Sequence, residues 1–142
     1  MPYIIPTDNG PVDVPARFEI AAHDVRMLTS VCHSVSIEKG WWHNPVTGED
    51  LRPSFNVGEK LALVHSEVSE ALEGHRREAM DDHLPHRKAI EVELADALIR
   101  IFDLGGVLHL DLGGALAEKM AYNCVRKDHT KEARLAEGGK KF

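Results

Sequence analysis

The sequence predicts an all-α protein, a single antiparallel bundle of four helices. Apolar residues recur at helical spacing in four segments, at about 16–38, 57–78, 87–104 and from Asp111 onward. Short polar or glycine-containing stretches separate the last three segments, which favours antiparallel neighbours. The length of 142 residues suffices for one domain with a core of its own.

Composition narrows the possible functions. The net charge of −6 argues against nucleic-acid binding, because phosphate backbones are held by clustered Lys and Arg. Cys32 and Cys124 belong to no C-x-x-C pair, so we expect no structural disulfide and a reducing, cytoplasmic location. The N-terminus does not resemble a signal peptide and no stretch approaches 18 apolar residues, so we expect no membrane association.

Residues 1–14 contain three prolines and a glycine, and we expect an extended arm rather than a core element. The first helix is expected to follow Pro15 and to end before Gly40. His23 and His33 within it are expected to be packing or surface residues rather than ligands. The next segment, WWHNPVTGEDLRPSF, contains two prolines and a glycine, which predicts an irregular loop.

The boundaries of the second helix have clear signals. Asn56 is the expected N-cap, and Glu59 three residues later supplies a capping-box partner. The turn after this helix holds His83 and His86, and because Pro85 breaks any helix there we expect a loop rather than a metal site.

The third helix is expected to end at Gly105 and Gly106, and Asp111 is a good N-cap for the fourth, which should run through LGGALAEKMAYNCVRKD. Residues 15–130 would then form the domain. Residues 131–142 are polar and glycine-rich, and we expect a flexible tail.

Each of the two central helices carries two acids three residues apart, Glu67 with Glu70 and Glu93 with Asp96. Residues three apart share a helix face. Glu67 and Glu93 fall inside the apolar arcs of their helices, where an ionised carboxylate is costly unless a positive group meets it. Oxygen ligands favour Mg²⁺, Mn²⁺ or Ca²⁺ over Zn²⁺. The alternative is that both pairs are solvated surface acids.

The order E-x-x-E, 22 residues, E-x-x-D resembles the metal-binding motif of the MazG-like all-α nucleoside triphosphate pyrophosphohydrolases. The flanking segments NVGEKLALVHSEVSEALEGHRRE and EVELADALIRIFDLGG are similar to the phage and bacterial single-domain members. With the later segment LGGALAEKMAYNCVRKDH, the resemblance covers roughly residues 15–130. The resemblance implies hydrolysis of a nucleoside triphosphate to the monophosphate and pyrophosphate, with Mg²⁺ as cofactor and Mn²⁺ as a substitute. It also suggests that deoxynucleotides or damaged nucleotides are removed from the nucleotide pool.

On this reading Glu67, Glu70, Glu93 and Asp96 hold Mg²⁺, which bridges phosphate oxygens and activates a water for in-line attack. One of the four acids could instead orient that water as a base, and Glu70 at the edge of its helix face is a candidate. On the sequence alone, each of the four acids could be a metal ligand or the base.

The resemblance implies that Lys119 and Asn123, with Arg126, face the triphosphate. These residues lie at i, i+4 and i+7, and two cations with an amide suit phosphate oxygens, although a solvated helix face is the alternative. Lys60 is expected to pair with Glu67, to meet a phosphate or to be solvated.

Trp41 and Trp42 are the only tryptophans of the chain. Aromatic rings stack on nucleobases, so we hypothesise that at least one of them closes over the base of the substrate. Packing of the loop onto the helices is the alternative.

Two other functions share parts of the pattern. A di-iron carboxylate bundle needs E-x-x-H on two helices, and neither acidic helix has a His at that position. A non-catalytic bundle of the same fold would bind a nucleotide or a protein partner without releasing pyrophosphate.

The first and fourth helices and the segment between the third and fourth hold more apolar residues than one small core needs, namely Val31, Val35, Leu108, Leu110, Leu116 and Met120. Together with the resemblance, this surplus predicts a homodimer or a dimer of dimers that completes the bundle.

Overall fold

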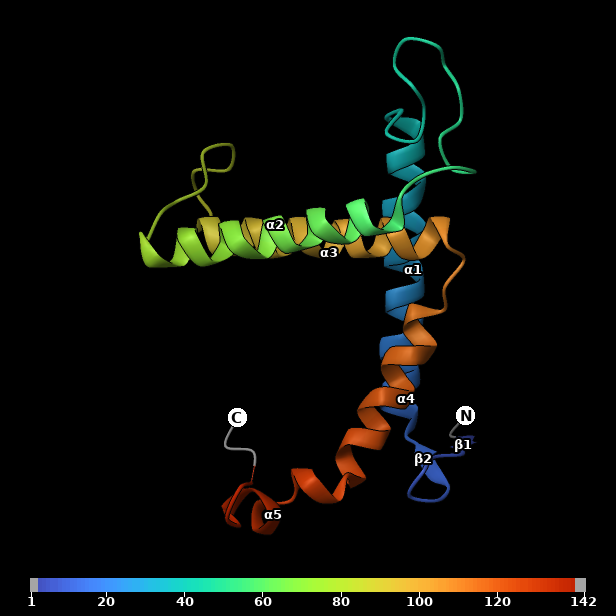
Figure 1. The fold of residues 1–142 in the computed structure, drawn as a ribbon, viewed down its shortest axis with the longest axis vertical. Coiled ribbons are helices and arrows are strands. Elements are labelled where there is room, and N and C mark those ends of the chain that lie inside the picture. The colour runs from blue at the N-terminus through green and yellow to red at the C-terminus, as the bar shows by residue number, and fades with distance from the viewer. Residues whose placement is uncertain (1–2, 140–142) are drawn as a thin grey trace. The chain divides into compact units, whose positions relative to one another are not determined.

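The computed structural model describes residues 3–139, and this part of the chain is mostly helical (Figure 1). The elements, in order, are β1 (Tyr3–Ile5), β2 (Val12–Val14), α1 (Ala16–Glu38), α2 (Val57–Arg76), α3 (Ala89–Val107), α4 (Leu112–Val125), a 3-10 turn (Lys127–His129) and α5 (Lys131–Leu135). Within residues 3–139, none of the helices combines the length and the apolar character that a membrane crossing requires.

The chain divides into two compact units, which are described separately. Unit 1 comprises Met1–Met27 and Asp111–Phe142, and unit 2 comprises Leu28–Leu110. The boundary between them falls inside α1.

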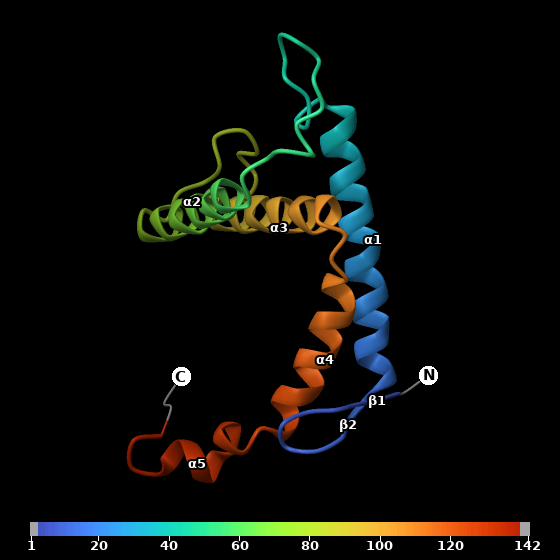
Figure 2. The same ribbon diagram turned by 45° about the vertical axis from the view of Figure 1, so that its right-hand side comes forward.

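Helices α2 and α3 form the centre of unit 2 and run antiparallel, side by side, in both ribbon views (Figure 1, Figure 2). The side chain of Asn56 accepts a hydrogen bond from the Glu59 N–H, which confirms the predicted N-cap of α2. Ala71 and Ala97 are buried, and small side chains at such positions allow close helix contact.

The connection between α2 and α3 is a loop, as predicted. The Asp81 carboxylate accepts hydrogen bonds from the backbone N–H groups of His83 and Leu84, and this closes a turn just before Pro85. His83 and His86 are exposed.

The predicted end of α3 at Gly105 and Gly106 is wrong, because the helix continues to Val107. A Cβ atom at residue 106 would lie 2.5 Å from the His33 Cβ, so this glycine permits close contact between α3 and α1. Gly106 therefore allows close packing and does not end the helix.

Unit 1 contains a β-hairpin where the sequence suggested an arm outside the core. Strands β1 and β2 pair with Ile5 opposite Val12, and reciprocal backbone hydrogen bonds between Thr7 and Gly10 close the turn. Pro6 and Pro11 flank that turn outside the paired residues, so their missing N–H groups remove no bond from the pairing. Residues 1–2 of the predicted arm lie outside the described part.

The hairpin supplies much of the core of unit 1, which corrects the expectation for residues 1–14. Its buried side chains pack in one cluster with alanines of α1 and α4, and the members are Ile5, Val12, Val14, Ala22, Ala117 and Ala121. Helix α4 approaches α1 so closely that a Cβ at Gly113 would lie 2.3 Å from the Ala22 carbonyl oxygen. Within the predicted tail, residues 131–135 form α5, while residues 140–142 lie outside the described part.

Candidate metal centre

Three carboxylates from the two central helices converge at one point of unit 2. One oxygen each from Glu67 of α2 and from Glu93 and Asp96 of α3 lies within 4.8 Å of the other two. Glu67 is buried, and Glu93 and Asp96 are half-buried. We call these three residues the acid cluster. The spacing predicts that the two acid pairs face each other, and three of the four residues do lie together.

Glu70 is exposed and lies outside the acid cluster. Its charge nevertheless raises the pKa of Glu93, so the two side chains are near enough to interact. Glu70 therefore adds negative charge to the cluster from an exposed position, which we call its rim.

The acid cluster is electrostatically strained. Burial raises the pKa of Glu93, and the nearby carboxyl groups of Glu70 and Glu67 raise it further. Burial also raises the pKa of Asp96, with a further increase from Glu67 that Arg100 partly offsets. The folded chain thus disfavours the fully ionised cluster and would be stabilised by added positive charge.

Arg100 contacts the cluster, and sequence reasoning missed it. Its Nε–H donates to Glu67 Oε1 at 2.5 Å, from a side chain that is 42% exposed to one that is 8% exposed. Arg100 follows Asp96 by one turn of α3. A cation four residues after an acid lies on the same helix face, and this spacing could have placed Arg100 near the cluster. The burial of Glu67 alone therefore does not require a metal, but one guanidinium carries too little charge to neutralise three carboxylates.

A cavity of about 280 Å³ adjoins the cluster, and Asp96 of the cluster and the neighbouring Arg100 line it. Trp41 and Lys60 form other parts of its wall. Lys60 does not pair with Glu67 but lies over the ring of Trp42, with its ammonium nitrogen 4.5 Å from the ring centroid.

The two tryptophans have different surroundings. Trp42 is 1% exposed and packs edge-on against Phe55, and its Nε1–H donates to Asp103 Oδ1 at 2.9 Å. Trp41 is 73% exposed and forms part of the cavity wall. Each of the two interpretations of the loop thus suits one tryptophan, with Trp42 packed on the helices and Trp41 accessible to a ligand.

Asp103 anchors this loop and was not recognised as doing so. Besides the Trp42 indole, it accepts hydrogen bonds from Ser36 Oγ at 2.8 Å and from His33 Nδ1 at 2.7 Å. His33 is thus a packing residue with a polar partner, in line with expectation. The sequence places Asp103 two turns after Asp96 on the same helix. It does not show the partners of Asp103, because these come from α1 and from the loop.

Lys119, Asn123 and Arg126 belong to unit 1, whereas the acid cluster belongs to unit 2. The prediction that all three share one helical stripe is wrong, because α4 ends at Val125 and Arg126 has an extended backbone. Lys119 and Arg126 both lie over the ring of Tyr122, at 4.9 and 5.7 Å from its centroid. Within residues 3–139, the buried Oδ1 of Asn123 has no hydrogen-bond partner.

Arg126 also forms an ion pair with Asp128 at 2.6 Å. This pair satisfies two of its N–H groups, so a phosphate would have to compete with the Asp128 carboxylate.

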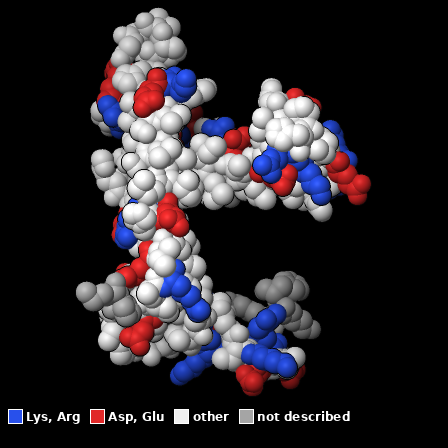
Figure 3. All heavy atoms as spheres, turned by 180° about the vertical axis from the view of Figure 1, so that it is seen from behind, with Lys and Arg blue, Asp and Glu red and all other residues white. Residues whose placement is uncertain are grey.

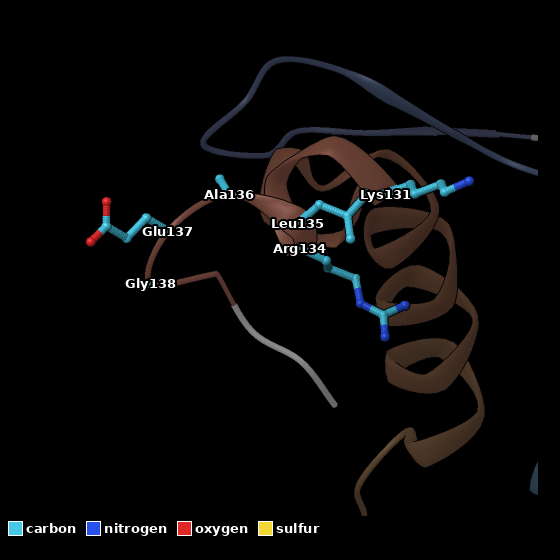
Figure 4. Close-up of a pocket in the computed structure, with 6 residues that line it drawn as sticks. All are labelled: Lys131, Arg134, Leu135, Ala136, Glu137 and Gly138. Atoms are coloured by element: carbon cyan, nitrogen blue, oxygen red, sulfur yellow. The ribbon is translucent and has the colours of Figure 1, made fainter.

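A larger cavity of about 650 Å³ lies in unit 1, around α5 and the residues that follow it (Figure 4). Its wall includes Arg134 and Glu137, whose charged groups point away from each other in Figure 4. It contains none of the predicted acids and is no part of the candidate metal centre.

The chain was compared with protein-family models, curated proteins and solved structures. It matches none of them. The MazG-like resemblance therefore rests on the acid spacing, its flanking residues and the later segment LGGALAEKMAYNCVRKDH alone.

The raised pKa values predict how stability depends on pH. A carboxyl group with a raised pKa binds its proton more tightly in the folded state, so metal-free protein should lose stability as pH rises from about 4.5, through the raised pKa values of Glu93 and Asp96. Denaturant titrations in EDTA between about pH 5 and pH 8 would measure this slope. Replacement Glu93→Gln should flatten it, and a stability that rises over the range in wild type would contradict the prediction.

Proposed function

We propose that this chain hydrolyses nucleoside triphosphates to the monophosphate and pyrophosphate with Mg²⁺, for which Mn²⁺ could substitute. The observation that carries the proposal is the convergence of Glu67, Glu93 and Asp96 from two adjacent helices. The raised pKa values of Glu93 and Asp96 also indicate that the cluster lacks positive charge.

The donor set suits a hard divalent cation. Carboxylate oxygens bind Mg²⁺ at about 2.1 Å, so oxygens on opposite sides of one ion are about 4.2 Å apart. The oxygens of the acid cluster lie within 4.8 Å of one another, and small side-chain movements would bring them to that spacing. Glu70 at the rim is available as a further ligand or as the base that orients water.

Bound Mg²⁺ would neutralise charge on the phosphates and lower the pKa of the attacking water. The residues of the chain would orient the attacking water and the nucleotide. The exposed carboxylate of Glu70 can accept the proton of that water, and the cavity beside Asp96 can receive part of the nucleotide. The exposed ring of Trp41 offers a stacking surface for the base, and Lys60 adds positive charge to the same wall.

The resemblance adds Lys119, Asn123 and Arg126 to the proposal as contacts for the β- and γ-phosphates. Two cations and an amide suit phosphate oxygens chemically. The buried Asn123 Oδ1, which has no partner within residues 3–139, is an acceptor, so a contact of this side chain to phosphate would have to be made by its amide N–H groups.

Pyrophosphate release from a panel of ribo-, deoxy- and modified nucleoside triphosphates tests the function. Metal-dependent release that EDTA abolishes is the expected result, and the best substrate would identify the base and sugar. If folded protein binds a nucleotide but releases no pyrophosphate from any of them, the non-catalytic binding bundle replaces this proposal.

The proposed assembly is a homodimer or a dimer of dimers, in which the helices complete an all-α pyrophosphohydrolase bundle. Charged side chains crowd the outer end of the α2 and α3 pair in Figure 3, and further acidic and basic groups lie elsewhere on this face. The two helices leave large apolar side chains half-exposed, namely Leu61, Val68, Leu72, Leu94, Leu98 and Ile101.

A second copy would cover these side chains and remove apolar area from water. Sedimentation equilibrium should therefore give at least twice the chain mass of 15.8 kDa. A mass equal to one chain, over the micromolar range, would contradict the prediction.

A further inference from the structure

Arg100 forms a hydrogen bond to Glu67, the buried member of the acid cluster. Its Nε–H donates to Glu67 Oε1, one of the carboxyl oxygens of α2 at the acid cluster. A guanidinium and a metal ion cannot occupy the same side of one carboxylate oxygen, because both positive groups need the same lone pairs.

The surroundings of Arg100 also provide a second position for its side chain. The residue is half-exposed and lines both the cavity of about 280 Å³ and an adjacent small space of about 40 Å³. Lys60 lines the same two spaces, held over the Trp42 ring. The two cations therefore already lie on one cavity wall, and a rotation of the long Arg100 side chain away from Glu67 would free its guanidinium to bind an anion there together with Lys60.

We propose that Arg100 is an exchangeable counter-ion: metal binding displaces its guanidinium from Glu67, and the released group joins Lys60 to hold the anionic phosphates of the substrate. The inference rests on the proposed function, since it assumes a metal at the acid cluster. It makes Arg100 a residue that opposes metal in the free protein and assists nucleotide binding once metal is present.

Charge balance supports this exchange. The acid cluster with Glu70 carries up to four negative charges, against which Arg100 supplies one positive charge and a divalent ion supplies two. Once the ion is bound, the need for Arg100 at Glu67 falls, and the phosphates of the substrate offer a stronger partner because charge-assisted hydrogen bonds to phosphate are bidentate for Arg. Metal and nucleotide would then bind cooperatively through one side chain.

Metal affinity is the first test. Mn²⁺ binding to Arg100→Gln, measured by calorimetry without nucleotide, should be at least about fivefold tighter than to wild type, because the competing charge-assisted hydrogen bond is gone. Arg77→Gln is the matched control, since it removes the same charge from an exposed ion pair with Glu73 and should leave the affinity unchanged.

Nucleotide affinity is the second test. With saturating Mn²⁺, a non-hydrolysable triphosphate analogue should bind Arg100→Gln about tenfold more weakly than wild type. Arg100→Lys should recover part of this affinity, because it restores the charge without the planar fork. A static structural ion pair would give neither the gain in metal affinity nor the loss in nucleotide affinity.

The wild-type protein allows a direct observation that no misfolded variant can obscure. The Arg100 Nε–H signal in ¹H–¹⁵N NMR spectra, assigned from the Arg100→Lys spectrum, should shift on saturation with Mg²⁺. A wild type that binds neither Mg²⁺ nor Mn²⁺ would defeat the proposed function and this inference together. Metal binding that leaves the Arg100 signal in place, or an unchanged or lower metal affinity in Arg100→Gln, would overturn the inference alone.

Discussion

Replacement of Glu93 by Gln is expected to lower pyrophosphate release by at least about a hundredfold, as removal of one catalytic group commonly does. The metal-free variant should be as stable as wild type at neutral pH, or more stable. Burial raises the pKa of Glu93, which means that its ionised form is unfavourable in the fold, and Gln removes that charge while keeping the shape. Loss of activity together with retained stability is the signature of a functional acid.

Glu93 is a sharper choice than Glu67, because Glu67→Gln would also deprive Arg100 of its partner. Glu73→Gln is the matched control on α2, since Glu73 is exposed and pairs with Arg77. It should retain full activity. Thermal unfolding with and without Mg²⁺ supplies the second readout, and a Glu93→Gln protein that is still stabilised by Mg²⁺ to the wild-type extent would argue against a metal ligand at this position.

Replacement of Trp42 by Ala is expected to lower the free energy of unfolding by about 3–5 kcal/mol, which is typical of a buried aromatic side chain. The ring of Trp42 is 1% exposed, and its indole N–H donates to the half-buried Asp103. Denaturant titration followed by circular dichroism measures the effect. Trp42→Phe keeps most of the packing and loses the hydrogen bond, so its cost should be about 1–2 kcal/mol.

Trp41→Ala is the matched control in the same loop. Its side chain is 73% exposed, so the change in unfolding free energy should stay within about 0.5 kcal/mol. If Trp41 stacks on the base, the Michaelis constant for nucleotides should rise, since each stacked base contributes about 1–3 kcal/mol. Equal stability losses in Trp41→Ala and Trp42→Ala would contradict the different roles assigned to them.

Local sequence signals predicted the helices well because each signal acts within a few residues. Asn56 caps α2 through its own side chain, and Asp111 caps α4 through the Gly114 N–H. The exceptions depend on contacts between distant segments. Gly106 was interpreted as a helix end, yet its role is set by His33 on another helix.

The β-hairpin escaped prediction for a different reason. The strands are three residues long, and Pro6 and Pro11 masked the turn that Thr7 and Gly10 form between them. Gly10 has a φ of 99°, a conformation that glycine adopts readily and that the turn requires. Proline next to a strand was taken as evidence against structure, whereas here it lies where no hydrogen bond is lost.

The acids of the candidate metal centre were predictable because helix periodicity places Glu93 and Asp96 on one face. Periodicity does not say which residues of other segments complete a site. Arg100 reaches Glu67 on the neighbouring helix, and Asp103 accepts a hydrogen bond from Trp42, which lies in a loop 61 residues earlier in the chain. The side chains that neutralise or anchor the predicted acids could therefore be found only once the helices were placed side by side.

The contrast between the two neighbouring indoles gives the protein two built-in optical reporters. Trp42, shielded and hydrogen-bonded to Asp103, should emit at short wavelength and resist collisional quenchers such as iodide. Trp41, facing solvent at the cavity wall, should emit at long wavelength and lose intensity when a ligand stacks on it. Detachment of the loop and arrival of a ligand would thus change different parts of one fluorescence spectrum, without any added label.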